Sequence, residues 1–461
     1  MKHLRSHIAI LVIAALSVGL YFYRLVALDM DVLAVICMAS VCLAALKDVR
    51  FLFVGWFLAT PYFIPLAAEG SSNIPSNFSH NYFVPVITAI TLFYYYLKGK
   101  KLSFGKEDLF IILFIVYAVF SSFYSTKGRY DDLRGIYIIY IIPFFLYVIA
   151  KNIEIDARFL KMLAYVSLFH LVQMACLSIY ELQTAATLYP PNPKVDWVDV
   201  GSMRRLGGAF GTPIIFGVFL QVLFGFIYLA YRYDLISKLV FRLSMPLLVV
   251  MNIFSFTRSV WLGAVVTYIY LMYKTSEDFG AKLVRIVGLV FLAAATVAVL
   301  VAVSPDVQKR IAGEENANFR VVMAEASLHM IADKPLVGWG MGTFDDYSDR
   351  YLFDALGVYI VKDTSHVTLL TIVAELGILG AVPFLLFIYF NLFHKGIRIS
   401  DLPSEDLLIV VVSTGAIIAF AVNGFLIDMR FYSLAYSWFF MSMGFIHNIF
   451  RENIALRIQE E

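Results

Sequence analysis

The sequence predicts an all-α polytopic membrane protein with about 12–14 transmembrane helices. Of its 461 residues, 61% are hydrophobic and only 15% are charged, whereas an ordinary soluble domain is roughly 45–50% apolar and about 25% charged. The apolar residues are also gathered into runs that approach the length of about 20 residues that a membrane-crossing helix needs. This composition excludes a cytosolic globular enzyme, a disordered scaffold and a nucleic-acid-binding protein.

The candidate spans follow one another with short polar connections. The runs at residues 136–150 and 260–273 are the shortest, which is why the expected number is a range. The first run follows basic residues and could also be a signal peptide, although no small-residue cleavage site comes after it. The candidate spans are residues 8–23, 31–46, 51–67, 82–97, 109–124, 136–150, 159–180, 212–231, 239–256, 260–273, 283–303, 367–393, 407–422 and 431–450.

Lysine and arginine residues predict the orientation of the chain, because cytoplasmic loops are enriched in them. They fall in every second connection, so both termini are expected in the cytoplasm. One connection on the opposite side, with Lys127, Arg129 and Arg134, departs from the pattern. The clusters assigned to the inner side are Lys47 and Arg50; Lys98, Lys100, Lys101 and Lys106; Lys151, Arg158 and Lys161; Arg232, Lys238 and Arg242; Lys274, Lys282 and Arg285; Lys395 and Arg398; Arg451 and Arg457.

Two long segments, 181–211 and 304–365, fall on the outer side. We therefore expect three parts: transmembrane helices over 1–303, a large outer loop with short helices over 304–365, and C-terminal transmembrane helices over 366–461. Because most of the polar mass lies on the outer face, which is periplasmic in a Gram-negative bacterium, the chemistry is expected there.

The large outer loop contains one clear helical pattern. Residues 318–333 predict an amphipathic helix whose apolar face carries Val321, Ala324, Leu328 and Ile331. The helix is expected to end before Pro335. A glycine loop (residues 336–344) follows, in which Gly338, Gly340 and Gly342 allow sharp turns and close backbone approach. A simple tight surface turn would have the same composition.

A histidine and four arginines are the polar candidates on the outer side. His366 lies where the large loop meets the next span and could deprotonate a hydroxyl, although its position alone favours an interfacial histidine without a catalytic role. Arg204, Arg205, Arg258 and Arg320 flank the two long outer segments. Any one of them could extend to lipid head groups, but together they predict a diphosphate-binding cluster, since arginine grips phosphate groups bidentately.

Three ordered motifs complete the pattern. They are R-x-x-G-x-F-x-x-P from Arg205 to Pro213, T-R-S at residues 257–259, and a loop pattern that runs from Arg320 through K-P-L-V-G at 334–338 to His366 and E-L-G at 375–377. In this order they resemble the O-antigen ligase and polymerase superfamily of bacterial polysaccharide assembly. The sequence departs from the family at Ile214 and Val367, where asparagine is common. Glu375, within an apolar run, could be a buried structural carboxyl.

The resemblance implies a glycosyltransferase-C-like enzyme of the bacterial inner membrane that needs no cofactor or metal. Its donor would be an undecaprenyl-diphosphate-linked glycan and its acceptor a hydroxyl of lipid A–core or of another glycan, with membrane lipids around it. Arg204, Arg205, Arg258 and Arg320 would stabilise the diphosphate leaving group and His366 would serve as the base. Ligase and polymerase activities both fit. A lipid-linked glycan transporter (flippase) is the alternative from another class, and a scaffold subunit of a synthesis complex is a third.

Overall fold

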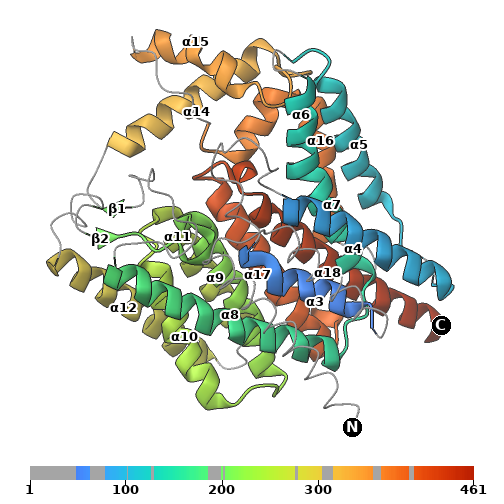
Figure 1. Ribbon diagram of the computed structural model, residues 1–461, viewed down its shortest axis with the longest axis vertical. Helices are drawn as coiled ribbons and strands as arrows, with labels where there is room; N and C mark the ends of the chain where they lie inside the picture. The colour runs from blue at the N-terminus through green and yellow to red at the C-terminus, as the bar shows by residue number, and fades with distance from the viewer. Residues whose placement is uncertain are drawn as a thin grey trace, which may run out of the picture. The chain divides into compact units, whose positions relative to one another are not determined.

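The computed structural model describes residues 48–62, 78–100, 102–125, 129–184, 199–200, 203–275, 279–303, 315–356, 365–393 and 399–460. This part of the chain is helical, apart from connections and one sheet of two short strands, β1 (Asp199–Val200) and β2 (Met203–Arg204). Five of the described helices are long and apolar enough to cross a membrane. The expected all-α polytopic membrane fold is therefore confirmed (Figure 1).

Each candidate span within the described residues coincides, wholly or in part, with helix. The first two candidates, 8–23 and 31–46, lie outside the described residues. The total of 12–14 spans, the three-part division of the chain and the cytoplasmic position of both termini stay predictions.

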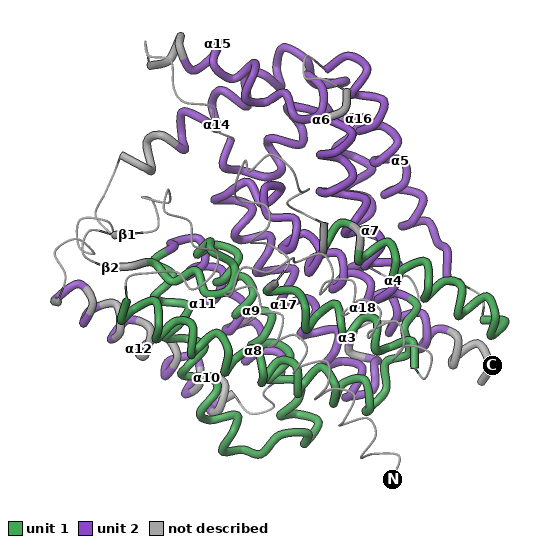
Figure 2. Tube along the Cα trace, viewed as in Figure 1, with its two compact units in different colours: residues 1–102, 152–199, 204–256 green, residues 103–151, 200–203, 257–461 purple. Residues whose placement is uncertain are grey.

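The chain divides into two compact units (Figure 2). Unit 1 comprises Met1–Leu102, Asn152–Asp199 and Arg204–Phe256, and unit 2 comprises Ser103–Lys151, Val200–Met203 and Thr257–Glu461. We describe each unit by itself.

Unit 1 is built around a predominantly apolar helix, α9, which packs against α8 and α10. A helix that is hydrophobic on all sides belongs in an interior, and α9 is buried along almost its whole length. Aromatic rings fill the core, with Phe57 5.3 Å from Phe226 and Phe210 4.9 Å from Phe219 between ring centroids. The helices of unit 1 are α3 (Arg50–Ala59), η1 (Thr60–Tyr62), α4 (Phe78–Leu97), α8 (Ala157–Thr184), η4 (Gly208–Phe210), α9 (Pro213–Arg232) and α10 (Lys238–Ile253).

Unit 2 contains three long packed pairs: α5 lies along α16, α11 along α17, and α17 along α18. Its helices are α5 (Lys106–Ser121), α6 (Arg129–Ile136), the π-helical turn η2 (Tyr137–Ile141), α7 (Ile142–Asn152), α11 (Arg258–Thr275), α12 (Phe279–Val303), α14 (Glu315–Asp333), α15 (Phe344–Leu356), α16 (Thr368–Leu392), η5 (Ile399–Asp401), α17 (Ser404–Gly424), η6 (Met429–Phe431) and α18 (Ser433–Glu460).

A buried lysine ties three of these helices together. Lys151 of α7 donates from Nζ to Glu107 Oε1 at 2.7 Å and to Asp108 Oδ2 at 2.5 Å, both in the first turn of α5. His447 of α18 lies 3.4 Å from the same Glu107 oxygen. A lysine buried among apolar helices needs such partners, because an unpaired charge there is strongly destabilising. The cluster therefore fixes one end of α5.

Helix α14, in the loop predicted to be outer, forms, but it buries only part of the apolar face expected. It begins at Glu315, three residues before the predicted start. Met323, Ala326 and Met330 face a small core that includes Trp339 and Phe344. Of the predicted apolar face, Val321 and Leu328 are more than half exposed, whereas Ile331 packs against this core. Helix α15 covers the acidic, aromatic stretch after the glycine loop and packs against α14 (Figure 1).

Candidate functional site

The glycine loop has the backbone that its composition suggests. Gly338, Gly340 and Gly342 have φ values of 72°, 105° and 74°, in the left-handed region that glycine adopts readily. A Cβ on Gly338 would lie 2.3 Å from the carbonyl oxygen of Glu375. The loop thus passes so close to α16 that only a hydrogen fits at this position.

Helix α16 is broken where the loop passes. Gly377 has φ 62° and ψ −171°, which interrupts the helical hydrogen bonding. The freed groups bond to the loop instead, and the pairing is reciprocal. Ala374 and Glu375 accept through their carbonyls from the N–H groups of Trp339 (3.1 Å) and Gly340 (2.8 Å). In return, Ile378 and Leu379 donate to the carbonyls of Pro335 (2.9 Å) and Leu336 (3.1 Å).

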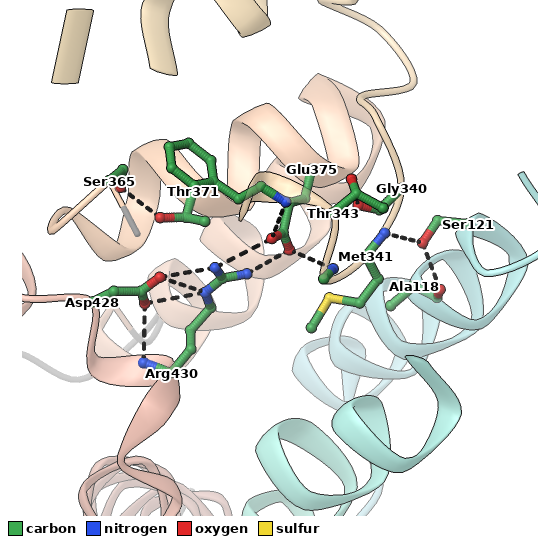
Figure 3. A network of polar contacts seen from close by, with 12 residues as sticks. Ala118, Ser121, Gly340, Met341, Thr343, Ser365, Thr371, Glu375, Asp428 and Arg430 are labelled. Atoms are coloured by element: carbon green, nitrogen blue, oxygen red, sulfur yellow. Dashed lines mark hydrogen bonds and ion pairs between the residues drawn. The ribbon is translucent and has the colours of Figure 1, made fainter. Parts of the chain in front are cut away.

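The carboxylate of Glu375 holds the far end of the loop. It is almost completely buried and accepts the N–H groups of Gly342 at 2.9 Å and Phe344 at 3.3 Å. On the α5 side, the Met341 N–H donates to Ser121 Oγ at 3.1 Å. The loop is therefore fastened to two helices of unit 2, α16 and α5 (Figure 3).

Arg430, in the turn between α17 and α18, completes a buried charge cluster with Glu375 and Asp428 (Figure 3). Its Nη1 lies 2.6 Å from Glu375 Oε2, while Nε and Nη2 bond to both oxygens of Asp428 at 2.8–3.1 Å. Burial acts to lower the pKa of Arg430, but the charges of Asp428 and Glu375 raise it well above its usual value. The guanidinium is a permanent cation that positions the Glu375 carboxylate.

The same turn holds the start of α16, next to His366. The N–H of Met429 donates to Thr368 Oγ1 at 2.9 Å, and that hydroxyl donates to the Ile427 carbonyl at 3.2 Å. His366 is half-exposed and has φ 56°, an uncommon value for a residue with a side chain. Ser365 stabilises this conformation, because its hydroxyl accepts the Val367 N–H at 3.0 Å.

The arginine candidates occupy different environments. Arg258 is the first residue of α11 and is exposed, and Arg320 is half-exposed in the second turn of α14 rather than at its start. Arg205 is buried in unit 1, where its Nε donates to the Ser255 carbonyl at 3.4 Å. Arg204 ends β2, and its side chain lies outside the described part.

These residues belong to both units. Arg205 lies in unit 1, whereas Arg258, Arg320 and His366 lie in unit 2. Their convergence on one diphosphate therefore stays a prediction. Within unit 1, the backbone beside Arg205 pairs with the end of α10, since the Leu206 N–H donates to the Phe254 carbonyl at 3.0 Å. Arg258 follows four residues after Phe254 in the sequence.

Sequence reasoning missed Arg430 and Asp428. The available signal was a short charged turn, Asp428-Met429-Arg430, between the last two apolar runs, on the side where positive charge is uncommon. Glu375 was expected as a buried structural carboxyl, and its burial is confirmed.

Comparison with family models gives a match over part of the chain. Residues 243–385 match a family model described as O-Antigen ligase. The matched segment contains Arg258, Arg320, the glycine loop and His366, and the match confirms the resemblance to the O-antigen ligase and polymerase superfamily. A search of curated proteins returned no match.

Proposed function

From the O-antigen ligase domain at residues 243–385, which marks a glycosyltransferase-like membrane enzyme, we propose the reaction that this chain performs. It transfers a glycan from an undecaprenyl-diphosphate carrier to an acceptor hydroxyl at the outer face of the bacterial inner membrane. The observation that carries the proposal is that α16 bears both His366, just before its first turn, and the attachment of the glycine loop further along, where Glu375 joins the loop to Arg430.

In the proposed reaction the acceptor oxygen attacks the anomeric carbon of the donor sugar. A new C–O bond forms while the bond to the lipid diphosphate breaks, and the diphosphate leaves with the bonding electrons. The acceptor proton passes to the imidazole of His366, which acts as general base if it is neutral. Negative charge grows on the leaving group, so fixed guanidinium groups would lower the barrier. Arg205, Arg258 and Arg320 are proposed for this role, with Arg204 beside them.

In the proposed arrangement the donor would react without a metal. Guanidinium groups bind phosphate bidentately and stay charged at every physiological pH, so they can supply the charge stabilisation that a divalent cation supplies elsewhere. The acceptor is a hydroxyl of lipid A–core in a ligase, or of a lipid-linked glycan in a polymerase.

The test is a reaction with purified full-length protein, a lipid-diphosphate-linked glycan and candidate acceptors in the presence of a chelator. We expect His366→Ala and Arg258→Ala to lower the rate by about 100-fold or more, as loss of a base or of a charge-stabilising donor does elsewhere. The matched controls are His329→Ala and Arg350→Ala, which change exposed residues on α14 and α15 and should keep normal rates.

The length of the product distinguishes polymerase from ligase activity. A ladder of lengths indicates a polymerase, and a single transfer to the acceptor indicates a ligase. Normal rates for both site variants would exclude the assigned roles. Movement of the lipid-linked glycan across liposomes with its glycosidic bond intact, and with no transfer, would overturn the proposal in favour of a transporter.

A further inference from the structure

Two apolar side chains at the beginning of the glycine loop face away from the protein. Leu336 is 60% exposed and Val337 is 46% exposed, whereas Trp339, Met341 and Phe344 of the same loop are buried. The loop has a filled inner side and an apolar outer side. A loop that stands in water would be expected to carry polar residues at such positions.

The outer side of the loop continues an apolar surface of the membrane helices. On α16, a candidate membrane span, the exposed apolar residues recur at helical spacing from Ile378 and Leu379 to Val382 and Leu385. Leu379 is hydrogen-bonded to Leu336 through the backbone. Helix α5 packs along α16 and has its own exposed apolar stripe of Leu109, Leu113, Val116 and Phe120, which Phe123 continues just beyond the end of the helix. Lipid is the environment that such stripes require.

The backbone of this part of the loop is satisfied by protein rather than left for water. The Val337 carbonyl accepts two hydroxyl groups, from Tyr124 at 2.7 Å and Tyr117 at 3.1 Å, although these contacts are exposed. The carbonyls of Pro335 and Leu336 accept N–H groups of α16. Three successive carbonyls outside a regular helix thus have protein donors. Irregular backbone at membrane depth depends on such internal bonding, because hydrocarbon offers no hydrogen bonds.

The residues around this segment are typical of a membrane interface. Tyr117 and Tyr124 join an apolar ring to a polar hydroxyl, a combination enriched at the level of lipid head groups. Lys334, immediately before Pro335, places its ammonium 3.9 Å from the centroid of the Trp339 ring. A lysine stem can lie along apolar surface while its charge reaches the head groups.

We propose that Leu336 and Val337 insert into the hydrocarbon of the bilayer, so that the glycine loop is anchored in the membrane surface rather than held above it. The partner is the acyl chains of membrane phospholipids, and in the orientation predicted from the sequence these belong to the outer leaflet. The anchor fixes the depth of the loop, and through Glu375 it fixes the depth of the Arg430 cluster. The inference does not depend on which reaction the protein performs.

Nitroxide labels on cysteine test this depth. In full-length protein with Cys37, Cys42 and Cys176 changed to serine, labels at Leu336→Cys and Val337→Cys would be measured in vesicles of phosphatidylethanolamine and phosphatidylglycerol. Relaxation by oxygen reports hydrocarbon, and relaxation by a water-soluble nickel chelate reports solvent. The controls are Leu385→Cys on the exposed face of α16 and Asp346→Cys, exposed on α15.

We expect the labels at 336 and 337 to lose nickel relaxation and to gain oxygen relaxation, as at 385, while the label at 346 shows the reverse. Nickel relaxation at 336 and 337 equal to that at 346 would overturn the proposal. A second measurement uses the unaltered chain, with a phosphatidylcholine that carries a photoactivatable diazirine in its acyl chain. Adducts on Leu336 and Val337 are expected beside those on α5 and α16; adducts on α5 and α16 alone would contradict the proposal.

Discussion

At the scale of single residues, Arg430 acts on the glycine loop through Glu375. Removing three charges from water costs several kcal/mol for each ion, and the cluster recovers this only through close pairing and additional hydrogen bonds. Arg430 forms ion pairs with Asp428 and Glu375. The Glu375 carboxylate also accepts hydrogen bonds from the N–H groups of Gly342 and Phe344. The position of the loop is therefore linked to a guanidinium on a different connection.

Arg430→Met tests this link. The substitution keeps an unbranched chain but leaves Glu375 and Asp428 as two buried carboxylates without a cation. We expect a loss of about 3–5 kcal/mol in the free energy of unfolding, the range found when one partner of a buried ion pair is removed. The measurement is thermal unfolding of the detergent-solubilised protein. Arg350→Met, which removes an exposed arginine of α15, should change stability by less than about 0.5 kcal/mol.

The triple variant with Glu375→Gln, Asp428→Asn and Arg430→Met tests whether the loss of stability in Arg430→Met comes from unpaired buried charge or from lost packing. Because it leaves no buried ion in the cluster, it should be more stable than Arg430→Met alone. If Arg430→Met unfolds at the temperature of the unaltered protein, the cluster does not hold the loop.

The burial of Glu375 could be predicted from its apolar neighbours, but its partner could not. Arg430 lies 55 residues further along the chain. In the sequence, the nearby Asp428 is already a sufficient partner for its charge, so nothing there points to Glu375. The sequence also places His366 at a loop–helix boundary. It contains no sign that Thr368, two residues later, is bonded to the turn between α17 and α18. Long-range hydrogen bonds of this kind have no periodic signature.

At the scale of elements, the break in α16 frees the backbone groups to which the glycine loop bonds. Hydropathy predicts one continuous span over 367–393, and a helix of nearly that extent is present. Hydropathy contains no information on the break at Gly377, because an apolar run has the same composition whether or not it is interrupted. Gly380 and Pro383, a few residues later, lie within helical backbone, so the residue type alone did not indicate which position breaks.

Gly377→Ala tests whether this break needs glycine. A Cβ there would lie 2.2 Å from the Leu336 carbonyl oxygen, in a backbone region that is essentially restricted to glycine. Gly99 is the matched control, because its φ of 64° is similar and no heavy atom lies within 4 Å of an added Cβ. We expect Gly99→Ala to cost about 1–2 kcal/mol from the left-handed conformation alone.

Gly377→Ala should lower the free energy of unfolding by clearly more than Gly99→Ala, because collision with the loop is added to the backbone strain. Thermal unfolding compares the two variants, and limited proteolysis of the outer loop shows whether the loop detaches. Equal losses of stability in both variants, with a loop as resistant to protease as before, would contradict this expectation. They would mean that the close contact between Gly377 and the loop adds nothing to the cost of the substitution.

Helix α14 shows why apolar periodicity found the helix but not its buried face. A period of 3.6 residues indicates which residues share a face, and the helix forms as expected. Assigning the apolar face to the interior assumes that water covers the other side. Val321 and Leu328 are exposed, while Met323 and Met330 are buried. Apolar residues thus occur on both the exposed and the buried side of α14, so hydrophobicity alone does not mark the inside.

At the scale of the whole molecule, α5 connects the Lys151 cluster at its first turn to the glycine loop at its last residue. Its first turn carries Glu107 and Asp108, which bind Lys151, and its last residue, Ser121, accepts the Met341 N–H of the glycine loop. The 16 residues between Lys106 and Ser121 span about 24 Å at 1.5 Å per residue, close to the thickness of the hydrocarbon core. The lysine-rich end and the glycine loop should therefore lie on opposite sides of the membrane.

This geometry makes the predicted orientation testable at two positions of unit 2. In a chain with Cys37, Cys42 and Cys176 changed to serine, Lys106→Cys lies at the exposed start of α5 and Asp346→Cys is exposed on α15. A membrane-impermeant maleimide added to intact cells should label Asp346→Cys fully. It should label Lys106→Cys only after the membrane is permeabilised, because lysine-rich connections stay in the cytoplasm. Equal labelling of both variants in denaturant would show that the two cysteines are equally reactive. Labelling of Lys106→Cys alone in intact cells would contradict the predicted orientation. It would place the glycine loop, with His366 and the proposed transfer reaction, on the cytoplasmic side.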